Sequence, residues 1–391
     1  MVVIMAGLLL IVGYYFGELF MPGHGDTGLL IAFALWLLLT LVSYFSGDKI
    51  FLAISGARKI GAEEHPILYN VVEEMKIASG LPKMPDIYII DDDAPNAFAT
   101  GRKPETASVA VTAGLLKIMT RDELQGVIAH EMGHVKNRDV LYMMIAGVMM
   151  GTIVLLADIG ARTLRFGGMR RTSSRGRGGG QAQAVILLVA ILLMILAPIV
   201  AQLLYFSISR RREYLADASS AIFTRYPEGL ASALEKISRT PLILHAANRA
   251  TAPMYIVNPL RATGVGLTDL TSTHPPTSER IRILRSMAGG AGLATYNEAF
   301  RKVTGRPVGV VPPSAVRIAP QVAVSGPRAA AEPTPAQRAR QATDALWKLN
   351  GYAFLTCGCG VKLKVPPSYS GKDVACPRCG RAMTVPAAAA K

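Results

Sequence analysis

Four long apolar stretches limit what this chain can fold into, because each is close to the length of a helix that crosses a lipid bilayer. Such a helix needs about 20 predominantly apolar residues. The stretches are Val2–Phe20, Gly28–Phe45, Val140–Leu156 and Val185–Ile208. The mean hydropathy of +0.32 and the 18% content of charged residues are typical of a membrane protein with polar parts attached. The sequence therefore predicts about four transmembrane helices in a lipid bilayer.

The charges that flank the first two stretches predict the orientation of the chain. Their connecting loop carries Glu18 and Asp26 but no Lys or Arg, whereas Lys49, Arg58 and Lys59 follow the second stretch. Cytoplasmic loops are enriched in Lys and Arg. We therefore expect a multi-pass protein of the cell (inner) membrane, with its polar parts and C-terminus in the cytoplasm. No Lys or Arg precedes the first stretch and no small-residue cleavage site follows it, so an uncleaved anchor is expected.

Much of the net charge of +15 lies in two loop-like segments. Six arginines lie between residues 162 and 177, and seven Lys or Arg lie between residues 301 and 340. In a membrane protein such charges are typical of juxtamembrane and linker segments, so nucleic-acid binding is the less favoured alternative. If both later apolar stretches cross the membrane, the first group lies outside, against the usual distribution. A hairpin that does not cross is the other possibility.

The chain divides into four parts. Residues 1–46 hold the first two apolar stretches, and residues 47–303 form an α/β domain that the other two stretches interrupt. Residues 304–342 are rich in Ala, Pro and Arg without a clear period, which is typical of a linker. Residues 343–391 contain all four cysteines and form a small separate unit. The predicted fold class is α+β, mainly helical.

Hydrophobic periodicity predicts several elements of the α/β domain. His65–Ser79 has helical spacing, and Asp86–Ile90 and Ser108–Thr112 have the character of strands. Ser108–Thr112 is a candidate sheet edge to which an extended peptide adds by backbone hydrogen bonds; a strand buried inside the sheet is the alternative. The fourth apolar stretch runs without Gly into Ser209–Tyr226, so one long helix is expected, kinked at Pro198.

The segment HEMGH is an H-E-x-x-H motif on a predicted helix. Thr120 and Glu123 have the spacing of a capping box that begins this helix. His130 and His134 are four residues apart and share a helix face, so both imidazoles can reach one metal ion. Glu131 lies beside them, where it can take a proton from a water that zinc has made acidic. Surface histidines without a metal are the alternative.

A catalytic zinc needs a third protein ligand and keeps one position open. Glu213 is the candidate, because it lies where the long helix leaves the fourth apolar stretch. Asp217 is one turn further on the same face and can accept a hydrogen bond from the free ring nitrogen of a ligand histidine. A solvated helix face is the alternative. Two apolar stretches separate His130 from Glu213, so two crossings, or a hairpin, return the chain to the same side of the membrane.

These motifs, in this order, resemble the M48 family of zinc metallopeptidases, and within it the HtpX-like bacterial membrane proteases. The resemblance rests on His130–His134, Glu213–Asp217, Asn96–Gly101 and Ser272–Pro276, and covers roughly residues 1–290. It implies a gluzincin-type zincin fold with transmembrane helices and zinc-dependent endoproteolysis. It also implies polypeptide substrates, chiefly membrane proteins, and a role in protein quality control.

By this resemblance, the zinc ligands are His130, His134 and Glu213. Glu131 matches the base and Asp217 the supporting carboxylate, and the resemblance adds two catalytic residues. Asn96 and His274 would hold the substrate backbone and stabilise the oxyanion. A donor aimed at the carbonyl oxygen helps because negative charge develops there during amide hydrolysis. The alternatives are a turn asparagine after Pro95 and a loop histidine that caps a helix beginning at Thr277.

The C-terminal unit contains the chain's four cysteines in two close pairs, Cys-Gly-Cys and Cys-Pro-Arg-Cys, with sixteen residues between the pairs. They are Cys357, Cys359, Cys376 and Cys379. With short strands at Val361–Val365 and Ala382–Val385, the pattern resembles a zinc ribbon, which holds a structural zinc on four thiolates with no open position. Disulfides or free thiols are the alternative, and the reducing cytoplasm argues against disulfides.

The sequence therefore predicts a membrane-bound zinc endopeptidase. A non-catalytic membrane adaptor that recruits partners through its zinc ribbon is the alternative. The presence of Glu131 argues against the adaptor, because a purely structural metal site needs no base. A prenyl-protein protease of the CAAX type shares the zinc chemistry but usually has more spans. The sequence does not assign the natural substrate, the oligomeric state or a partner of the ribbon.

Overall fold

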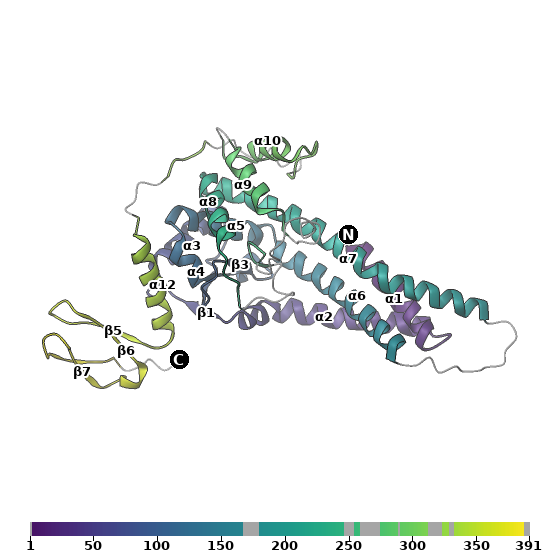
Figure 1. Ribbon diagram of the computed structural model, residues 1–391, viewed down its shortest axis with the longest axis horizontal. Coiled ribbons are helices and arrows are strands. Elements are labelled where there is room, and N and C mark those ends of the chain that lie inside the picture. The colour runs from purple at the N-terminus through teal and green to yellow at the C-terminus, as the bar shows by residue number, and fades with distance from the viewer. Residues whose placement is uncertain are drawn as a thin grey trace.

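The computed structural model describes residues 2–166, 180–245, 254–258, 274–287, 290–311, 323–327 and 332–386. The expectations for the arginine-rich segment 167–179 and for Ser272 and Thr273 lie outside the described residues. Four long helices extend from one side of a mixed α/β domain, and a helix with two small hairpins lies on the other side (Figure 1). The predicted class, mainly helical α+β, is confirmed.

The four apolar stretches form the helices α1 (Val2–Phe20), α2 (Gly25–Ile54), α6 (Asp139–Phe166) and α7 (Gly180–Thr224). Each is long and apolar enough to cross a membrane. All four contribute to one buried cluster, which includes Leu9, Ala32, Met149 and Ala201. Large apolar side chains cover their outer surfaces instead of polar ones, as expected of helices whose solvent is lipid.

Glycines allow α1 and α2 to pack closely. A Cβ added at Gly28 of α2 would lie 2.5 Å from the Cα of Gly17 and 2.3 Å from the carbonyl oxygen of Gly13, both on α1. Gly13 and Gly17 are four residues apart and therefore share one face of α1. Small residues at this spacing let the backbones of membrane helices come into contact.

The α/β domain contains a four-stranded sheet of β1 (Ala57–Ile60), β2 (Asp86–Ile90), β3 (Ala97–Thr100) and β4 (Ser108–Thr112), in the order β1-β2-β4-β3. The strand β4 pairs in parallel with β2 and antiparallel with β3. The expectation that Ser108–Thr112 forms a sheet edge is therefore wrong, and the alternative of an internal strand holds. Its residues are buried on both faces, as is usual for an internal strand. The edge strand beside the helix that carries the H-E-x-x-H motif is β3.

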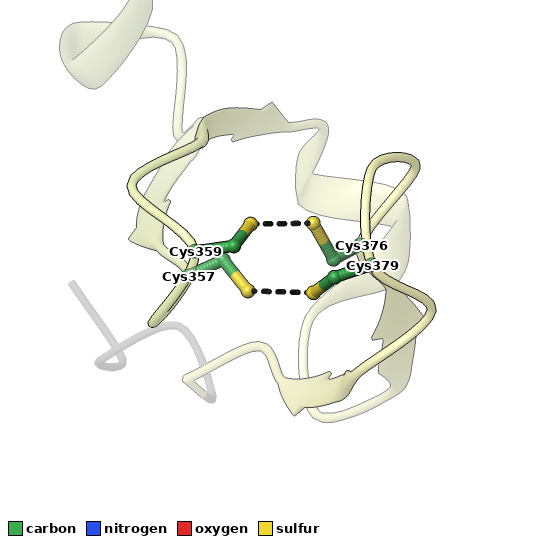
Figure 2. Close-up of side chains that lie close together, drawn as sticks. All are labelled: Cys357, Cys359, Cys376 and Cys379. Atoms are coloured by element: carbon green, nitrogen blue, oxygen red, sulfur yellow. Dashed lines mark hydrogen bonds between the residues drawn. The ribbon is translucent and has the colours of Figure 1, made fainter.

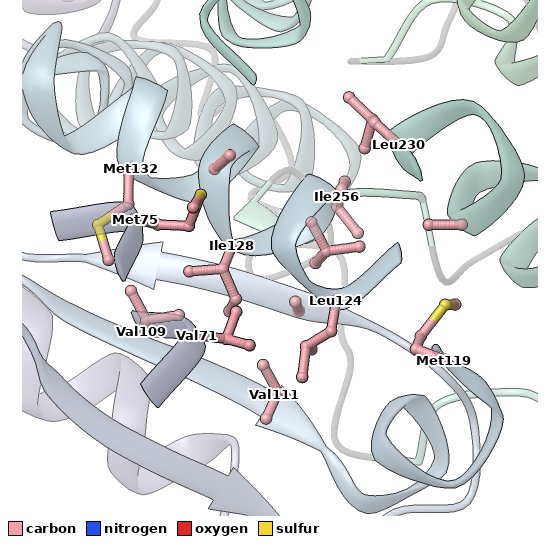
Figure 3. Close-up of a cluster of buried hydrophobic side chains, with 14 of the residues drawn as sticks. Val71, Met75, Val109, Val111, Met119, Leu124, Ile128, Met132, Leu230 and Ile256 are labelled. Atoms are coloured by element: carbon pink, nitrogen blue, oxygen red, sulfur yellow. The ribbon is translucent and has the colours of Figure 1, made fainter. Parts of the chain in front are cut away.

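Six helices surround the sheet and continue its core: α3 (Pro66–Ser79), α4 (Ala113–Ile118), α5 (Arg121–Lys136), α8 (Pro227–Arg239), α9 (Thr277–Arg285) and α10 (Leu293–Thr304). Figure 3 shows Leu124, Ile128 and Met132 of α5 packed between side chains of α3, β4 and α8. This core holds α5, which carries the H-E-x-x-H motif, in a fixed position.

The C-terminal part begins with α12 (Pro335–Leu349), followed by two hairpins. The hairpins are β5 (Ala353–Thr356) with β6 (Lys362–Val365), and β7 (Asp373–Ala375) with β8 (Ala382–Thr384). The expected linker over 304–342 is therefore wrong at its C-terminal end, because α12 begins within it. Ala342 and Ala345 of α12 are fully buried in the core of the α/β domain, and this packing stabilises a helix that the alanine-rich sequence does not reveal by period.

Candidate metal centre

The helix α5 begins at a complete capping box and presents its two histidines on one face. The Thr120 hydroxyl accepts from the Glu123 backbone N–H, and the Glu123 carboxylate accepts from the Thr120 N–H. The ammonium group of Lys236 on α8 lies 2.6 Å from the Glu123 carboxylate. The start of α5 is thereby tied to a neighbouring helix, and His130 and His134 follow on the buried side.

Three donor groups converge at the centre: the Nε2 atoms of His130 and His134 and the carboxylate of Glu213 on α7. The two Nε2 atoms are 3.2 Å apart. Glu213 Oε2 lies 3.6 Å from His130 Nε2, and Oε1 lies 3.3 Å from His134 Nε2. Nitrogen and oxygen ligands of a tetrahedral zinc, with bonds near 2.05 Å, are separated by about 3.3 Å. The donor set and its spacing therefore fit a zinc ion.

A glycine between the two histidines lets α5 reach α7. A Cβ added at Gly133 would lie 3.0 Å from Ser219 Cβ and 3.2 Å from Ala216 Cα. These two α7 residues follow Glu213 by three and six residues, within two turns, so α5 and α7 cross at small residues beside the donors. The close crossing is what brings Glu213 to the histidines across 79 residues of sequence that include two apolar helices.

Each histidine has a carboxylate behind it. Asp217 Oδ1 lies 2.9 Å from His130 Nδ1, the contact proposed from the sequence. Asp139 Oδ2 lies 2.9 Å from His134 Nδ1, and the sequence analysis did not include this residue. Such contacts fix the Nδ1–H tautomer and direct the Nε2 lone pair at the metal. Arg138, with φ of 56°, makes the sharp turn between α5 and α6 that returns Asp139 to His134.

Arg280 on α9 was also missed by the sequence analysis, although it is fully buried at the centre. Its Nε and Nη2 atoms donate to the two oxygens of Asp217 at 2.9 and 2.7 Å. Its Nη1 lies 3.1 Å from Glu213 Oε2 and donates to the Ile256 carbonyl at 2.8 Å. The nearby carboxylates raise the pKa of Arg280 above its ordinary value against the effect of burial. Arg280 thus holds both α7 carboxylates in place.

The charges around the site leave room for a divalent cation. Four buried carboxylates meet there, and they belong to Glu131, Asp139, Glu213 and Asp217. Two guanidinium groups offset them, because Arg280 pairs with Asp217 and Arg212 pairs with Asp139. With all four carboxylates ionised and both histidines neutral, as metal ligation requires, the carboxylates exceed the two arginines by two negative charges. Uncompensated charge in a buried site is costly, so this excess favours occupancy by an ion such as Zn²⁺.

Glu131 Oε1 is buried and has no hydrogen-bond partner among the described residues. The same is true of Glu213 Oε2, but that oxygen lies 3.1 Å from Arg280 Nη1. Glu131 lines the same cavity as His134 and Glu213. Burial raises the pKa of the Glu131 carboxyl to about 7, and the charge of Glu213 adds to this effect. A group with such a pKa can both accept and release a proton near neutral pH.

The two histidines differ in their environments. Burial lowers the pKa of His130 to about 4, despite the hydrogen bond to Asp217. Burial acts in the same direction on His134, but contacts with Asp139 and Glu213 raise its pKa well above the ordinary value. The surroundings of His134 therefore favour a positive charge in the space between its Nε2 atom and the Glu213 carboxylate. A bound metal cation would lie in this space.

Of the two other predicted catalytic residues, His274 lies beside the three donor groups and Asn96 does not. His274 lies at the centre, with Nε2 3.9 Å from Glu213 Oε1. Its ring is hydrogen-bonded to the backbone of Tyr255, and the N-cap residue of α9 is Pro276. Asn96 instead donates to the Val257 carbonyl at 2.9 Å. Among the described contacts, its amide joins the β3 edge to the segment around Val257 and does not reach the three donor groups.

Comparison with known proteins identifies the family. Residues 62–288 match the sequence profile described as Peptidase family M48. A protein named "Protease HtpX homolog" from Dictyoglomus thermophilum is 48% identical over 263 residues, covering 67% of this chain and 83% of the relative. Another of that name from Pyrococcus furiosus is 45% identical over 291 residues, covering 74% and 94%. The solved structure of S. mikatae Ste24p aligns with a TM-score of 0.44 and 20% identity over 71% of this chain and 62% of that chain, which is too distant to carry an argument.

The fold and the site define a multi-pass membrane protein with a buried H-E-x-x-H centre, which is a metallopeptidase design. The chain belongs to peptidase family M48. Within that family it is HtpX-like. The C-terminal part lies beyond residue 288, where the family match ends.

Proposed function

We propose that this chain is a zinc-dependent endopeptidase that cleaves membrane or membrane-associated polypeptides in protein quality control. The observation that carries the proposal is the convergence of His130, His134 and Glu213 with the unpaired oxygen of Glu131 beside them. The names of the relatives support protease activity. The spacing of the three donors supports zinc over larger cations with oxygen ligands.

In the proposed mechanism Glu131 moves the proton. Zinc held by the three donors would supply Lewis acidity, which polarises a peptide carbonyl and acidifies water. Glu131 then takes a proton from the attacking water and gives it to the leaving amine. Asp217 and Asp139 keep the two imidazoles oriented, and Arg280 holds Asp217 and Glu213 against their mutual repulsion.

His274 and Asn96 have separate proposed roles. His274, beside Glu213, is placed to donate to the carbonyl oxygen as negative charge develops on it. Asn96 holds the end of the β3 edge strand by its bonds to Val257, and in this way acts on substrate binding through the strand. Ala99, in the same strand, lines the cavity with Glu131.

The position of the cavity supports a substrate at the membrane surface. It is lined by Val140 and Met143, in the first turns of the apolar helix α6, and by Ser209, which follows the apolar part of α7. Three arginines come directly after Ser209, as is typical of the cytoplasmic end of a span. We infer that the centre lies at the cytoplasmic surface, and the packing of α6 and α7 with α1 and α2 supports full crossing by both.

The test is casein cleavage and self-cleavage by the purified protein in detergent, after zinc removal by a chelator and after its return. The wild-type protein should lose and regain activity, whereas Glu131→Gln should bind zinc and remain inactive at every zinc level. An exposed carboxylate on α10 offers a matched control, and Glu298→Gln should keep wild-type activity.

Three outcomes would contradict the proposal. Zinc-loaded wild-type protein that is as inert as Glu131→Gln would favour the adaptor alternative. Equal cleavage by both proteins would exclude Glu131 as the proton carrier. Cleavage restricted to prenylated C-terminal peptides would instead favour the CAAX type of protease.

A further inference from the structure

The four cysteines of the C-terminal part lie in the turns of its two hairpins. Cys357 and Cys359 lie between β5 and β6, and Cys376 and Cys379 lie between β7 and β8. Figure 2 shows the four side chains pointing toward one another from opposite sides. Each turn is closed by a backbone bond, from Gly360 N–H to the Cys357 carbonyl at 2.8 Å and from Gly380 N–H to the Cys376 carbonyl at 2.9 Å.

Both closing positions need glycine, because φ is 86° at Gly360 and 71° at Gly380. Residues with a Cβ rarely adopt this left-handed conformation. The two turns are thus similar in construction, and each presents two sulfur atoms on its inner side. Such paired turns point to a common ligand between the hairpins.

The sulfur atoms lie farther apart than a disulfide bond allows, and their spacing fits a metal. Cys357 Sγ lies 3.5 Å from Cys379 Sγ, and Cys359 Sγ lies 3.6 Å from Cys376 Sγ. A disulfide needs about 2.05 Å. Four thiolates on a tetrahedral zinc, with bonds of about 2.3 Å, are separated by about 3.8 Å. All four sulfur atoms lie within 4.8 Å of one another, so one ion can contact them all.

The hairpins have almost no hydrophobic core of their own. Among residues 353–386, the buried side chains are Cys357, Val365, Cys376 and Val385. A unit of this size cannot bury enough apolar surface to fold alone and usually depends on a metal or disulfides. The two cysteines in this set are themselves candidate ligands. The arrangement of the hairpins therefore needs an interaction that these few contacts do not supply.

We propose that Cys357, Cys359, Cys376 and Cys379 bind one Zn²⁺ in a closed structural site, and that this metal makes the two hairpins a rigid extension of α12. The site lies outside residues 62–288, which match the peptidase family. With four protein ligands it has no open position and carries no reaction. It is independent of the proposed peptidase centre, because no ligand is shared.

Contacts on both sides of α12 connect this extension to the α/β domain. On one side, Ala342 and Ala345 are buried in the main core. On the other, Lys364 of β6 lies 2.6 Å from Asp344, and the rings of Trp347 and Tyr352 meet at 4.3 Å. The helix itself is held by the α/β domain, so loss of the metal should release the hairpins and leave α12 docked.

Thiol chemistry on the full-length protein in detergent tests this proposal without relying on activity. Because the chain has four cysteines and all lie in the hairpins, a thiol reagent reads this site alone. We expect two zinc ions per chain and no fast-reacting thiol in the loaded protein. A mercurial reagent should release one zinc and react with four thiols, while casein cleavage changes less than two-fold. Hydrogen exchange should then accelerate in β5–β8 but not in α12.

The double variant Cys376→Ser/Cys379→Ser is expected to hold one zinc and to keep its casein cleavage. Four fast-reacting thiols in a protein that holds a single zinc would overturn the proposal. So would the absence of titratable thiols after denaturation without reductant, which indicates disulfides, or the visible absorption of iron bound to thiolates. If the variant does not fold, the mercurial experiment on the wild-type protein still decides. Untreated protein that does not cleave casein but gives the expected thiol result would refute only the peptidase proposal. Loss of cleavage when the mercurial reagent releases one zinc would contradict the independence of the two sites.

Discussion

The two candidate metal sites of this chain are built in opposite ways. The His130, His134 and Glu213 centre draws donors and supports from α5, α6, α7 and α9, which are distant in sequence. The cysteine site draws all its donors from two turns within 23 residues. Buried charged side chains that require ion-pair partners surround the first site. The ligands of the second site lie in hairpin turns that backbone hydrogen bonds close. The comparison suggests that a reactive site requires long-range assembly, whereas a structural site forms locally.

The largest expected effect is on the long-range site, through Arg280. Replacing it by Met leaves Asp217 and Glu213 as buried carboxylates without their cation, because both lose an ion pair. We expect Arg280→Met to destabilise the α/β domain by about 3–5 kcal/mol, measured from hydrogen exchange of α5 amides. Arg282→Met, at an exposed position of the same helix, should change it by less than about 0.5 kcal/mol. Equal effects of the two variants would show that Arg280 does not hold the centre together.

The α/β domain should also be acid-sensitive at a position away from both metal sites. His65 is buried at the N-cap of α3 and accepts from Leu68 N–H at 3.1 Å through Nδ1, and burial lowers its pKa to about 4. In the unfolded chain His65 binds a proton near pH 6.5. The stability that neutral His65 contributes is therefore fully present above pH 6.5 and is lost as the pH falls toward 4. The loss amounts to at most about 3 kcal/mol.

The variant His65→Asn keeps a side chain that can cap α3 but does not titrate. The difference in unfolding free energy between His65→Asn and the wild-type protein should therefore shift in favour of the variant between pH 6.5 and 4. Metal ligands titrate in both proteins, so their effect cancels in this difference. A difference that is independent of pH would show that the neutral form of His65 does not contribute.

A smaller effect is expected at Asp139, which orients His134 at the peptidase centre. Asp139→Asn keeps the size of the side chain but removes the charge that supports the Nδ1–H tautomer. We expect zinc affinity to fall by about 10–100-fold, measured by competition with a chromophoric chelator on protein whose cysteines are replaced by serine. Asp158→Asn, exposed toward the other end of α6, is the control and should have unchanged affinity. If Asp139→Asn leaves the zinc affinity unchanged, the role of Asp139 is limited to its ion pair with Arg212.

The smallest expected effect is at the junction between the two regions. The Glu332 carboxylate, just before α12, accepts from the backbone N–H of Arg121 in the first turn of α5 at 3.0 Å. Glu332→Gln removes a negative charge from this helix N-terminus, so we expect about 0.5–1 kcal/mol less stability for the first turn of α5. Hydrogen exchange of the α5 N-terminal amides measures it. A loss of zinc from either site would contradict the independence of the two regions.

The parts of the site that sequence reasoning found are those that local spacing specifies. His130, Glu131 and His134 lie on one turn of one helix, and the cysteines lie in recognisable turns. Glu213 required the assumption of two membrane crossings or a hairpin. The order of strands in the sheet was not available from periodicity, so the sequence left open whether Ser108–Thr112 is an edge strand or an internal strand, and it did not predict β3.

Arg280 and Asp139 were missed because their importance comes from tertiary packing. Arg280 is one of three arginines in α9, but it shares the buried face with Ile283 and Leu284, three and four residues on. A charge on the apolar face of a helix was the available signal. Asp139 stands directly before the third apolar stretch, five residues after His134. A buried carboxylate at the start of a span was the corresponding signal.

The central claim is that one chain holds two zinc ions in chemically different surroundings. Zinc X-ray absorption on the full-length protein, compared with a variant in which all four cysteines are replaced by serine, tests it most directly. The wild-type spectrum should contain both nitrogen or oxygen neighbours at about 2.0–2.2 Å and sulfur neighbours at about 2.3 Å. The variant should retain one zinc with nitrogen and oxygen neighbours alone. A variant that binds no zinc, or a wild-type spectrum with sulfur neighbours only, would contradict the account.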